Sequence, residues 1–285
     1  MTISRQSQTD LSAQHADRLV AYVAQLNLPI VAFSGGVDSA VVAAAAFRSH
    51  GEQALAVTAI SPSLANTQRQ RAREVAIQIG ILHQEVVTDE VSLPQYRRND
   101  GQRCFFCKQT LYSALTQVAQ KLAIDMADLL SGTNHDDLGD YRPGIQAGTQ
   151  AGVRTPLADL GLSKADVRRL ARHWNLPVWD VPASPCLSSR IAYGVEVTVE
   201  RLQRVEAAED FLAQRGFSPM RVRLHADDLA RIEVTRAAIA ELLAPPLWDE
   251  LVRHFLQLGF RYVTIDMQAF RSGSLNPLVT LQSRK

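Results

Sequence analysis

Residues 34–39, SGGVDS, place a pair of glycines between a short apolar run and an alanine-rich segment. The run at 28–33 is continuously apolar, as buried strands of parallel sheets are, and residues 38–50 predict a helix. Glycines at this junction allow positive φ angles and leave the backbone N–H groups at the helix start uncovered. Those N–H groups and the helix macrodipole attract anions, and Ser34 and Ser39 add hydroxyl donors. The segment therefore predicts a strand, a phosphate-binding loop and a helix.

Apolar periodicity and turn residues predict alternating strands and helices before a loop at 181–194. This alternation is typical of an α/β domain with a doubly wound, mainly parallel sheet. Asp10 is the predicted N-cap of the first helix, and Ser163 with Asp166 predicts a capping box. The predicted strands are 28–33, 54–60, 82–87 and 128–131, and the predicted helices are 10–27, 38–50, 65–79, 105–121 and one starting at Ser163.

The pattern changes after a loop predicted at 181–194, which holds two prolines and three serines. A helix at 198–215 is followed by short strands and helices, which indicates a smaller α+β domain. We therefore expect domains at 1–194 and 195–285. The remaining predicted strands are 220–224, 230–234 and 262–266, and the remaining predicted helices lie near 236–244 and 247–258.

Thirty basic and 29 acidic side chains give a net charge of +1. No bulk field therefore draws the protein to nucleic acid or to an anionic membrane. The first ten residues are polar, unlike a signal peptide, and the longest apolar run, 40–47, is too short to span a bilayer. We expect a cytoplasmic protein without nucleic-acid or membrane partners.

Ligands of a doubly wound sheet bind at the carboxyl ends of its strands. Ser61 ends the second predicted strand, where adenine can meet backbone groups, and Gly132 after the fourth allows a nucleotide to approach closely. The acid-rich run at 135–144 is either part of this site or a solvated turn. Asp38 either binds Mg²⁺ through oxygen or caps its own helix.

Cys104, Cys107 and Cys186 are the three cysteines of the chain, too few for a disulfide framework. The C-x-x-C pair with a distant third cysteine fits a zinc site lacking its fourth ligand, or a redox dithiol outside a thioredoxin-like setting. It also fits an iron–sulfur cluster held by three thiolates, or three unrelated buried cysteines. The spacing does not choose among these.

The pattern SGGxDS after a strand resembles the PP-loop ATP pyrophosphatases, and it lacks the lysine of the GxxxxGK[ST] phosphate loop. Longer motifs along nearly the whole chain resemble the LarE family of ATP-dependent sulfur transferases, which act in nickel-pincer nucleotide biosynthesis. These motifs are RCFFCK with the following Leu-Tyr, SGTNHDDLGDYRPG, PCLSSRIAYG, MRVRLH, RIE and the terminal RSGSLN.

The resemblance implies an adenine nucleotide alpha hydrolase-like fold, ATP and Mg²⁺. It implies adenylation of a carboxylate of pyridinium-3,5-biscarboxylic acid mononucleotide, release of pyrophosphate, and displacement of AMP by sulfur from sulfide or another donor, on each carboxylate in turn. Arg221 and Arg223 alternate on one strand and so share a face; the family match makes them phosphate ligands, and the alternative is an exposed basic strand edge. The family also tends to form homo-oligomers. Together with Ser61 and Gly132 at the strand ends, the predicted nucleotide-binding residues are Ser34, Gly35, Gly36, Asp38, Ser39, Arg221 and Arg223.

The family has two sulfur sources. In one, the cysteine at the position of Cys186 gives up its own sulfur; in the other, this cysteine and a C-x-x-C pair hold a [4Fe–4S] cluster that carries sulfide. Because Cys104 and Cys107 are also present, we favour the cluster, with Cys186 and Asp38 as catalytic residues. Arg190 either binds phosphate or caps a loop. Glu209 and Glu233 are candidate Mg²⁺ ligands, although helical glutamates are usually exposed.

Three other functions compete with this one. A tRNA thiolase of the same superfamily also uses three cysteines, but it needs a basic nucleic-acid surface. An amide-forming synthetase explains the loop and leaves the cysteines unused. A non-catalytic nucleotide-binding protein does not require the complete SGGVDS sequence found here.

Overall fold

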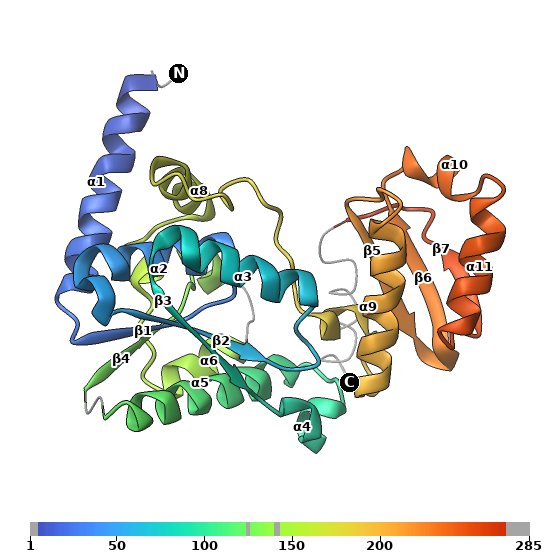
Figure 1. Ribbon diagram of the computed structural model, residues 1–285, viewed down its shortest axis with the longest axis horizontal. Helices are drawn as coiled ribbons and strands as arrows, with labels where there is room; N and C mark the ends of the chain where they lie inside the picture. The colour runs from blue at the N-terminus through green and yellow to red at the C-terminus, as the bar shows by residue number, and fades with distance from the viewer. Residues whose placement is uncertain (1–4, 124–125, 140–142, 272–285) are drawn as a thin grey trace. The chain divides into compact units, whose positions relative to one another are not determined.

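The computed structural model describes residues 5–123, 126–139 and 143–271 (Figure 1). The chain divides into two compact units, and each is described by itself. The first comprises residues 1–90 and 104–184, and the second comprises 91–103 and 185–285. These contact-based units divide after Ser184, whereas the sequence predicted domains that divide after residue 194. That residues 1–194 and 195–285 are separate folding domains stays a prediction.

The first unit contains a parallel sheet in the order β3-β2-β1-β4. β1 is central because Ile30 pairs with Leu55 on one side and with Leu129 on the other. This sheet confirms the predicted α/β class and doubly wound arrangement. The strands are β1 Leu28–Ala32, β2 Leu55–Ile60, β3 Leu82–Val87 and β4 Ala127–Leu130.

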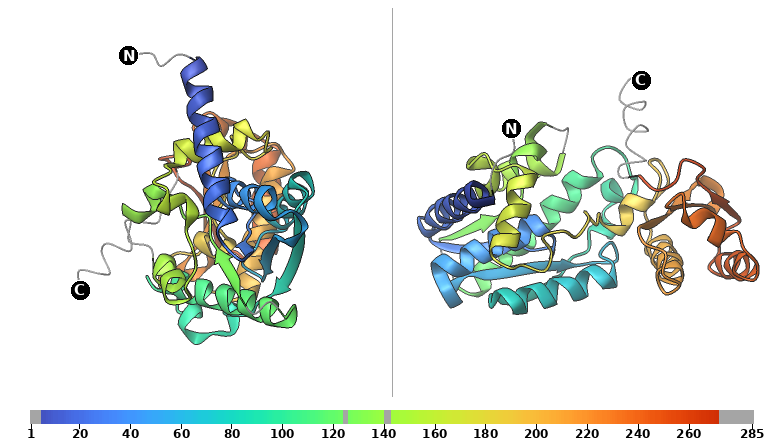
Figure 2. Two further views of the ribbon diagram at one scale, coloured as in Figure 1. Left: turned by 90° about the vertical axis from the view of Figure 1, so that its left-hand side faces the viewer. Right: turned by 90° about the horizontal axis from the view of Figure 1, so that it is seen from above.

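Helices cover both faces of this sheet (Figures 1 and 2). On one face, a core centred on α2 includes Leu19, Val41, Val75 and Leu170 from four helices, and all are buried. On the other face, α5 contributes a smaller core. The helices are α1 Arg5–Ala24, α2 Val37–His50, α3 Asn66–Ile79, α5 Arg103–Lys121, α6 Pro143–Gln150, α7 Pro156–Asp159 and α8 Lys164–His173.

Two helix starts test the capping predictions. The expectation that Asp10 caps α1 is wrong, because the helix already begins at Arg5. The preceding polar residues include neither glycine nor proline, so the helix continues beyond its apolar stripe. The capping box of α8 is confirmed: Ser163 Oγ accepts from the backbone N–H of Asp166 at 3.2 Å, and the Asp166 carboxylate accepts from the Ser163 N–H at 3.0 Å.

The second unit packs helices against a sheet in the order β5-β6-β7. β5 and β6 are antiparallel, and β7 runs parallel to β6. Leu202 and Val205 of α9 and Val222 of β5 are fully buried in this unit. The elements are α4 Pro94–Arg97, α9 Val199–Ala213, β5 Met220–His225, β6 Leu229–Val234, α10 Ala238–Leu242, α11 Leu247–Gln257 and β7 Tyr262–Ile265. In the part of the chain that is described, no helix combines the length and apolar character needed to cross a membrane.

Candidate functional site

The loop at 34–39 joins β1 to α2 at the carboxyl end of the sheet. Ser39 Oγ organises it, because this atom accepts from the Ser34 N–H at 3.2 Å and lies 3.1 Å from the Gly36 carbonyl oxygen, to which it donates. Gly36 is the N-cap and has no side chain to cover the helix terminus. The N–H groups of the first turn of α2 are thus available to an anion.

The two loop glycines differ in conformation. Gly35 has φ +68°, whereas Gly36 has φ −82°, so the expectation of a positive φ is met only at Gly35. A Cβ on Gly35 would lie 2.6 Å from the Cα of Ala72 in α3. Both its φ and its packing therefore demand glycine at position 35.

Gly132 follows β4 and lies against the start of α2. A Cβ there would lie 2.7 Å from the backbone nitrogen of Ser39 and 2.9 Å from the carbonyl carbon of Asp38. The close approach that requires glycine is therefore made by the helix start of the phosphate loop. Contact between Gly132 and a nucleotide stays a prediction.

Asp38 does not cap α2, since Gly36 occupies the N-cap position. Its Oδ2 forms an ion pair with Lys164 Nζ at 2.5 Å, and its Oδ1 accepts from Asn134 Nδ2 at 3.2 Å. Lys164 is the first residue of α8, 126 positions along the chain. The structure thus brings to the loop a lysine that the sequence analysis missed. No local pattern marks it, because only the fold makes the two segments neighbours.

The acid-rich run is described as far as Gly139; residues 140–142, which the prediction also covered, lie outside the described part. Asp136 Oδ2 accepts from the Lys164 N–H at 2.8 Å, and Asp137 Oδ2 accepts from the Asn134 N–H at 3.1 Å. These carboxylates therefore hold in place the segments that carry Lys164 and Asn134.

Cys104 and Cys107 lie in the first two turns of α5, three residues apart and so on one helix face. Cys104 is exposed and Cys107 is partly buried. Cys186 belongs to the second unit. Among the residues that the structure describes, no three histidine, cysteine or acidic side chains are grouped as a metal site requires.

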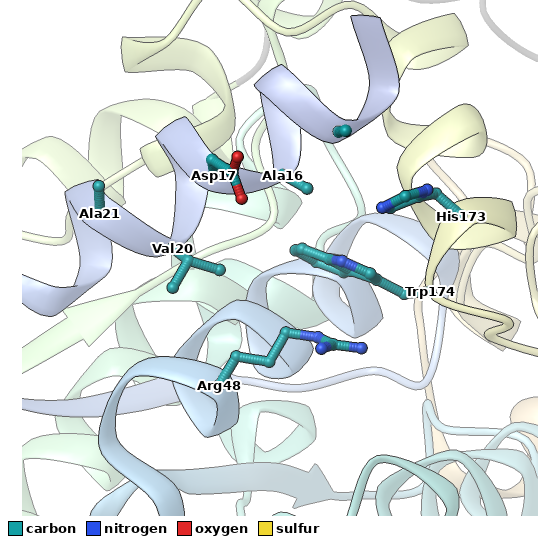
Figure 3. Close-up of a pocket in the computed structure, with 8 residues that line it drawn as sticks. Ala16, Asp17, Val20, Ala21, Arg48, His173 and Trp174 are labelled. Carbon is teal, nitrogen blue, oxygen red and sulfur yellow. The ribbon is translucent and has the colours of Figure 1, made fainter. Parts of the chain in front are cut away.

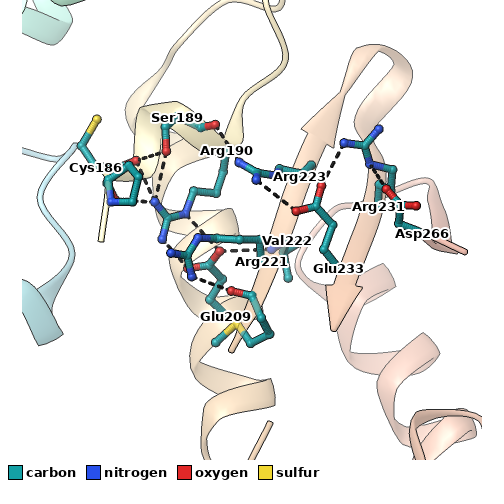
Figure 4. A network of polar contacts seen from close by, with 12 residues as sticks. Cys186, Ser189, Arg190, Glu209, Arg221, Val222, Arg223, Arg231, Glu233 and Asp266 are labelled. Atoms are coloured by element: carbon teal, nitrogen blue, oxygen red, sulfur yellow. Dashed lines mark hydrogen bonds and ion pairs between the residues drawn. The ribbon is translucent and has the colours of Figure 1, made fainter. Parts of the chain in front are cut away.

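Arg190 anchors the loop of Cys186 (Figure 4). Its Nη1 donates to the carbonyl oxygens of Pro185 and Cys186, and its Nε and Nη2 donate to the Glu209 carboxylate at 3.1 and 3.2 Å. Glu209 also accepts from the Val222 N–H at 3.1 Å. The sequence left two roles open for Arg190, phosphate binding and capping of a loop. The contacts it makes here are those of a loop cap.

Arg221 and Arg223 lie on one face of β5, but their surroundings differ (Figure 4). Arg223 is 5% exposed and donates to Glu233 Oε2 at 3.0 Å and to the Ser189 carbonyl at 3.0 Å. The alternative of an exposed basic edge is therefore wrong for Arg223. Arg221 is partly buried, and burial together with the neighbouring Arg190 lowers its pKa to about 10. Their role as phosphate ligands stays a prediction.

Glu209 and Glu233 are buried, contrary to the exposure usual for glutamates. Glu233 accepts from Arg223 through Oε2 and from Arg231 through Oε1, each at 3.0 Å. Arg231 also lies 3.5 Å from a carboxylate oxygen of Asp266. Both glutamates act here as counter-ions of arginines; as Mg²⁺ ligands they stay a prediction that none of these contacts supports.

A hollow of about 640 Å³ lies between α1, α2 and α8 of the first unit (Figure 3). The Arg48 guanidinium stacks over the Trp174 ring, 5.0 Å from its centroid. Asp17 and Val20 line it from α1. None of the site residues predicted from the sequence lines this hollow.

The chain is similar to a known family and to several known proteins. A family model described as asparagine synthase matches residues 20–98, which include the loop. The pyridinium-3,5-bisthiocarboxylic acid mononucleotide synthase of Lactiplantibacillus plantarum is 36% identical over 92% of this chain and 94% of its own length. An uncharacterised protein of Synechocystis is 44% identical over 93% of this chain and 97% of its own, and one of Methanocaldococcus jannaschii is 27% identical over 85% and 90%.

The parallel sheet, the SGGVDS loop and the matched family define a PP-loop enzyme domain. The identity to the synthase extends through both units, well beyond that domain. The chain belongs to the LarE family.

Proposed function

We propose that this protein is an ATP-dependent sulfur transferase. It adenylates the carboxylates of pyridinium-3,5-biscarboxylic acid mononucleotide, releases pyrophosphate, and exchanges AMP for sulfur to form the thiocarboxylates of the nickel-pincer nucleotide. The observation that carries this proposal is the 36% identity, over 92% of the chain, to a protein named as the synthase of that bisthiocarboxylate. The organised loop at 34–39 supports the ATP-dependent half.

Activation is needed because a carboxylate is a poor electrophile, whereas an acyl adenylate has a good leaving group. The N–H groups at the start of α2 bind the β and γ phosphates, and Ser34 and Ser39 add hydroxyls. Asp38 binds Mg²⁺ through oxygen, and Lys164 supplies the positive charge that the loop sequence lacks. These groups stabilise the charge that develops on the departing pyrophosphate.

In the second unit, Arg221 and Arg223 bind phosphate of the substrate or of AMP, a task suited to forked guanidinium donors. Glu233 fixes the orientation of Arg223, and Arg190 fixes the backbone of Cys186. The sulfur chemistry then takes place beside a cysteine whose carbonyl oxygen, like that of Pro185, accepts a hydrogen bond from Arg190 Nη1. Glu209 holds the same guanidinium through Nε and Nη2.

Cys104, Cys107 and Cys186 are proposed to hold a [4Fe–4S] cluster. Thiolates are the usual ligands of such clusters, and two of the three lie on one face of α5, which fits. When bound, a cluster with three cysteine ligands leaves one iron free to carry sulfide. Homo-oligomeric assembly stays a prediction.

Pyrophosphate release and product mass test the function. We expect pyrophosphate and AMP only with the carboxylate substrate and ATP, and a mass gain of about 16 Da for each oxygen replaced by sulfur. A protein that binds ATP without turnover would refute the proposal. Iron and sulfide analysis after anaerobic purification tests the sulfur source separately: absence of both, with a loss of about 34 Da from Cys186 after one turnover, would support the sacrificial route instead.

A further inference from the structure

A buried carboxylate at the strand ends of the first unit was not among the residues predicted from the sequence. Glu90 follows β3 and is only 3% exposed. Its Oε1 accepts from Ser61 Oγ at 2.6 Å and from Ser63 Oγ at 2.9 Å, and both serines follow β2. Because a buried carboxylate is costly without hydrogen bonds, the two serines fix the orientation of this side chain.

The other oxygen of this carboxylate, Oε2, receives no hydrogen bond from any residue in the described ranges, and it is not sealed from solvent. An acceptor atom on a rigidly held carboxylate is thus presented at the carboxyl end of the sheet. This is the edge at which a doubly wound domain binds its ligands.

Gln68, in the first turn of α3, offers a second acceptor. It is 9% exposed, its Nε2 donates to the Ser184 carbonyl, and its Oε1 is buried with no partner among the described residues. One turn further along α3, Ala72 contacts Gly35 of the phosphate loop. Buried polar atoms are normally satisfied, so Gln68 Oε1 calls for a ligand that donates a hydrogen bond. Glu90 Oε2, which is not sealed from solvent, is available to such a donor as well.

The order of the strands indicates which donor reaches Glu90. The phosphate loop follows β1, β2 lies next to it, and β3 is the second neighbour. With neighbouring strands about 4.8 Å apart, Glu90 lies roughly 10 Å across the sheet from the strand of the phosphate loop. A nucleotide with its phosphates at the loop and its ribose over β2 brings its base to this end of β3. The exocyclic amine of adenine is a donor, whereas a 6-oxopurine carries an acceptor at that position.

We propose that Glu90, oriented by Ser61 and Ser63, accepts a hydrogen bond from the exocyclic amine of adenine and thereby selects ATP over 6-oxopurine nucleotides. This inference rests on the proposed function, because it requires that ATP is bound. A carboxylate facing the 6-oxo oxygen of inosine triphosphate (ITP) brings two acceptors together, which disfavours that nucleotide.

Calorimetric measurement of ATP and ITP binding to the full-length protein, without carboxylate substrate, tests this role of Glu90. For Glu90→Gln we expect ATP binding to weaken about 10- to 100-fold, the range for losing a hydrogen bond to a charged group. ITP should bind as before or more tightly, because the amide can donate to its 6-oxo oxygen. Glu85→Gln, a change within β3 and away from this cluster, should leave the ratio of ATP to ITP affinity unchanged.

An unchanged ratio in Glu90→Gln would overturn the inference, even if both nucleotides bound more weakly, since a purely structural role weakens both equally. A wild-type protein that binds no ATP would overturn the proposed function as well. The double change Ser61→Ala with Ser63→Ala keeps the charge but releases its orientation. It should lower the ratio by about 3- to 10-fold, the effect of neutral hydrogen bonds, and an unchanged ratio would contradict the role of the serines.

Discussion

The phosphate loop of the first unit and the arginine network of the second differ in how they are held. The backbone of the loop is held by uncharged groups a few residues apart, such as Ser34 and Ser39. The network consists of buried charges from distant segments: Arg190 pairs with Glu209, 19 residues away, and Arg223 with Glu233, 10 residues away. The loop thus depends on backbone shape, whereas the network depends on every charge keeping its partner.

The largest loss of stability is expected when one partner of a buried ion pair is removed. Glu233 is fully buried and binds both Arg223 and Arg231. Glu233→Ala leaves buried arginine charge without its counter-ion, so we expect the free energy of unfolding to fall by about 3–5 kcal/mol. Urea denaturation measures this change in the free energy of unfolding. Glu196→Ala, which removes an exposed pair with Arg97, should cost less than about 1 kcal/mol, and equal losses would refute the contrast.

The stability of the phosphate loop should depend on backbone conformation and packing instead of charge. Gly35→Ala forces a side chain into a φ of +68° and to within 2.6 Å of the Ala72 Cα. We expect a loss of about 2–4 kcal/mol, from backbone strain and overpacking together, and no measurable pyrophosphate release. Gly36→Ala is the matched control, because φ is −82° there and the nearest atom to a Cβ is a side-chain atom, Ser34 Oγ, at 3.3 Å. If both variants lost the same stability, the conformational argument would be wrong.

Lys164 is an exception to this contrast, because it brings a charge from a distant segment to the phosphate loop. Its side chain is 32% exposed and that of Asp38 is 25% exposed, so their ion pair contributes little to stability. We expect Lys164→Met to reduce pyrophosphate release about 10²- to 10³-fold, as losing a group that stabilises developing charge does, while changing the free energy of unfolding by less than about 1 kcal/mol. Lys121→Met, an exposed change in α5, is the control; retained activity in Lys164→Met would remove Lys164 from the site.

The difference between local contacts and charge pairs from distant segments also explains which features could be predicted from the sequence. The loop, its strand and its helix carry local signals, namely an apolar run, two glycines and helix periodicity, and the structure places them within a residue of the prediction. The capping box at Ser163 is equally local. Family resemblance supplied Arg221 and Arg223 as candidates, but it did not indicate which carboxylates pair with them.

Pairing could not be predicted because it depends on register and packing. Arg221 faces Glu233 across the ladder, yet Glu233 bonds to Arg223 and Arg231. Lys164 reaches Asp38 only because α8 packs beside α2. Glu90 lies three residues beyond β3 and gains its partners from the end of β2. None of these pairs has a spacing that marks it in the chain.

The smallest expected effect concerns an ion cluster that is neither loop nor buried network. Glu85 on β3 accepts hydrogen bonds from Arg69 and Arg73 of α3, and these lower its pKa from 4.5 to about 2. Since the folded-state pKa lies below the unfolded one, the cluster stabilises the fold above about pH 4.5, and this contribution is lost as the pH falls toward 2. The arginines are 37% and 46% exposed, so we expect Glu85→Gln to cost less than about 1 kcal/mol at pH 6. Denaturation of both proteins at pH 6 and near pH 2 checks this: the difference should shrink in acid and in high salt, and one that persisted in both would show that Glu85 acts through packing and not through charge.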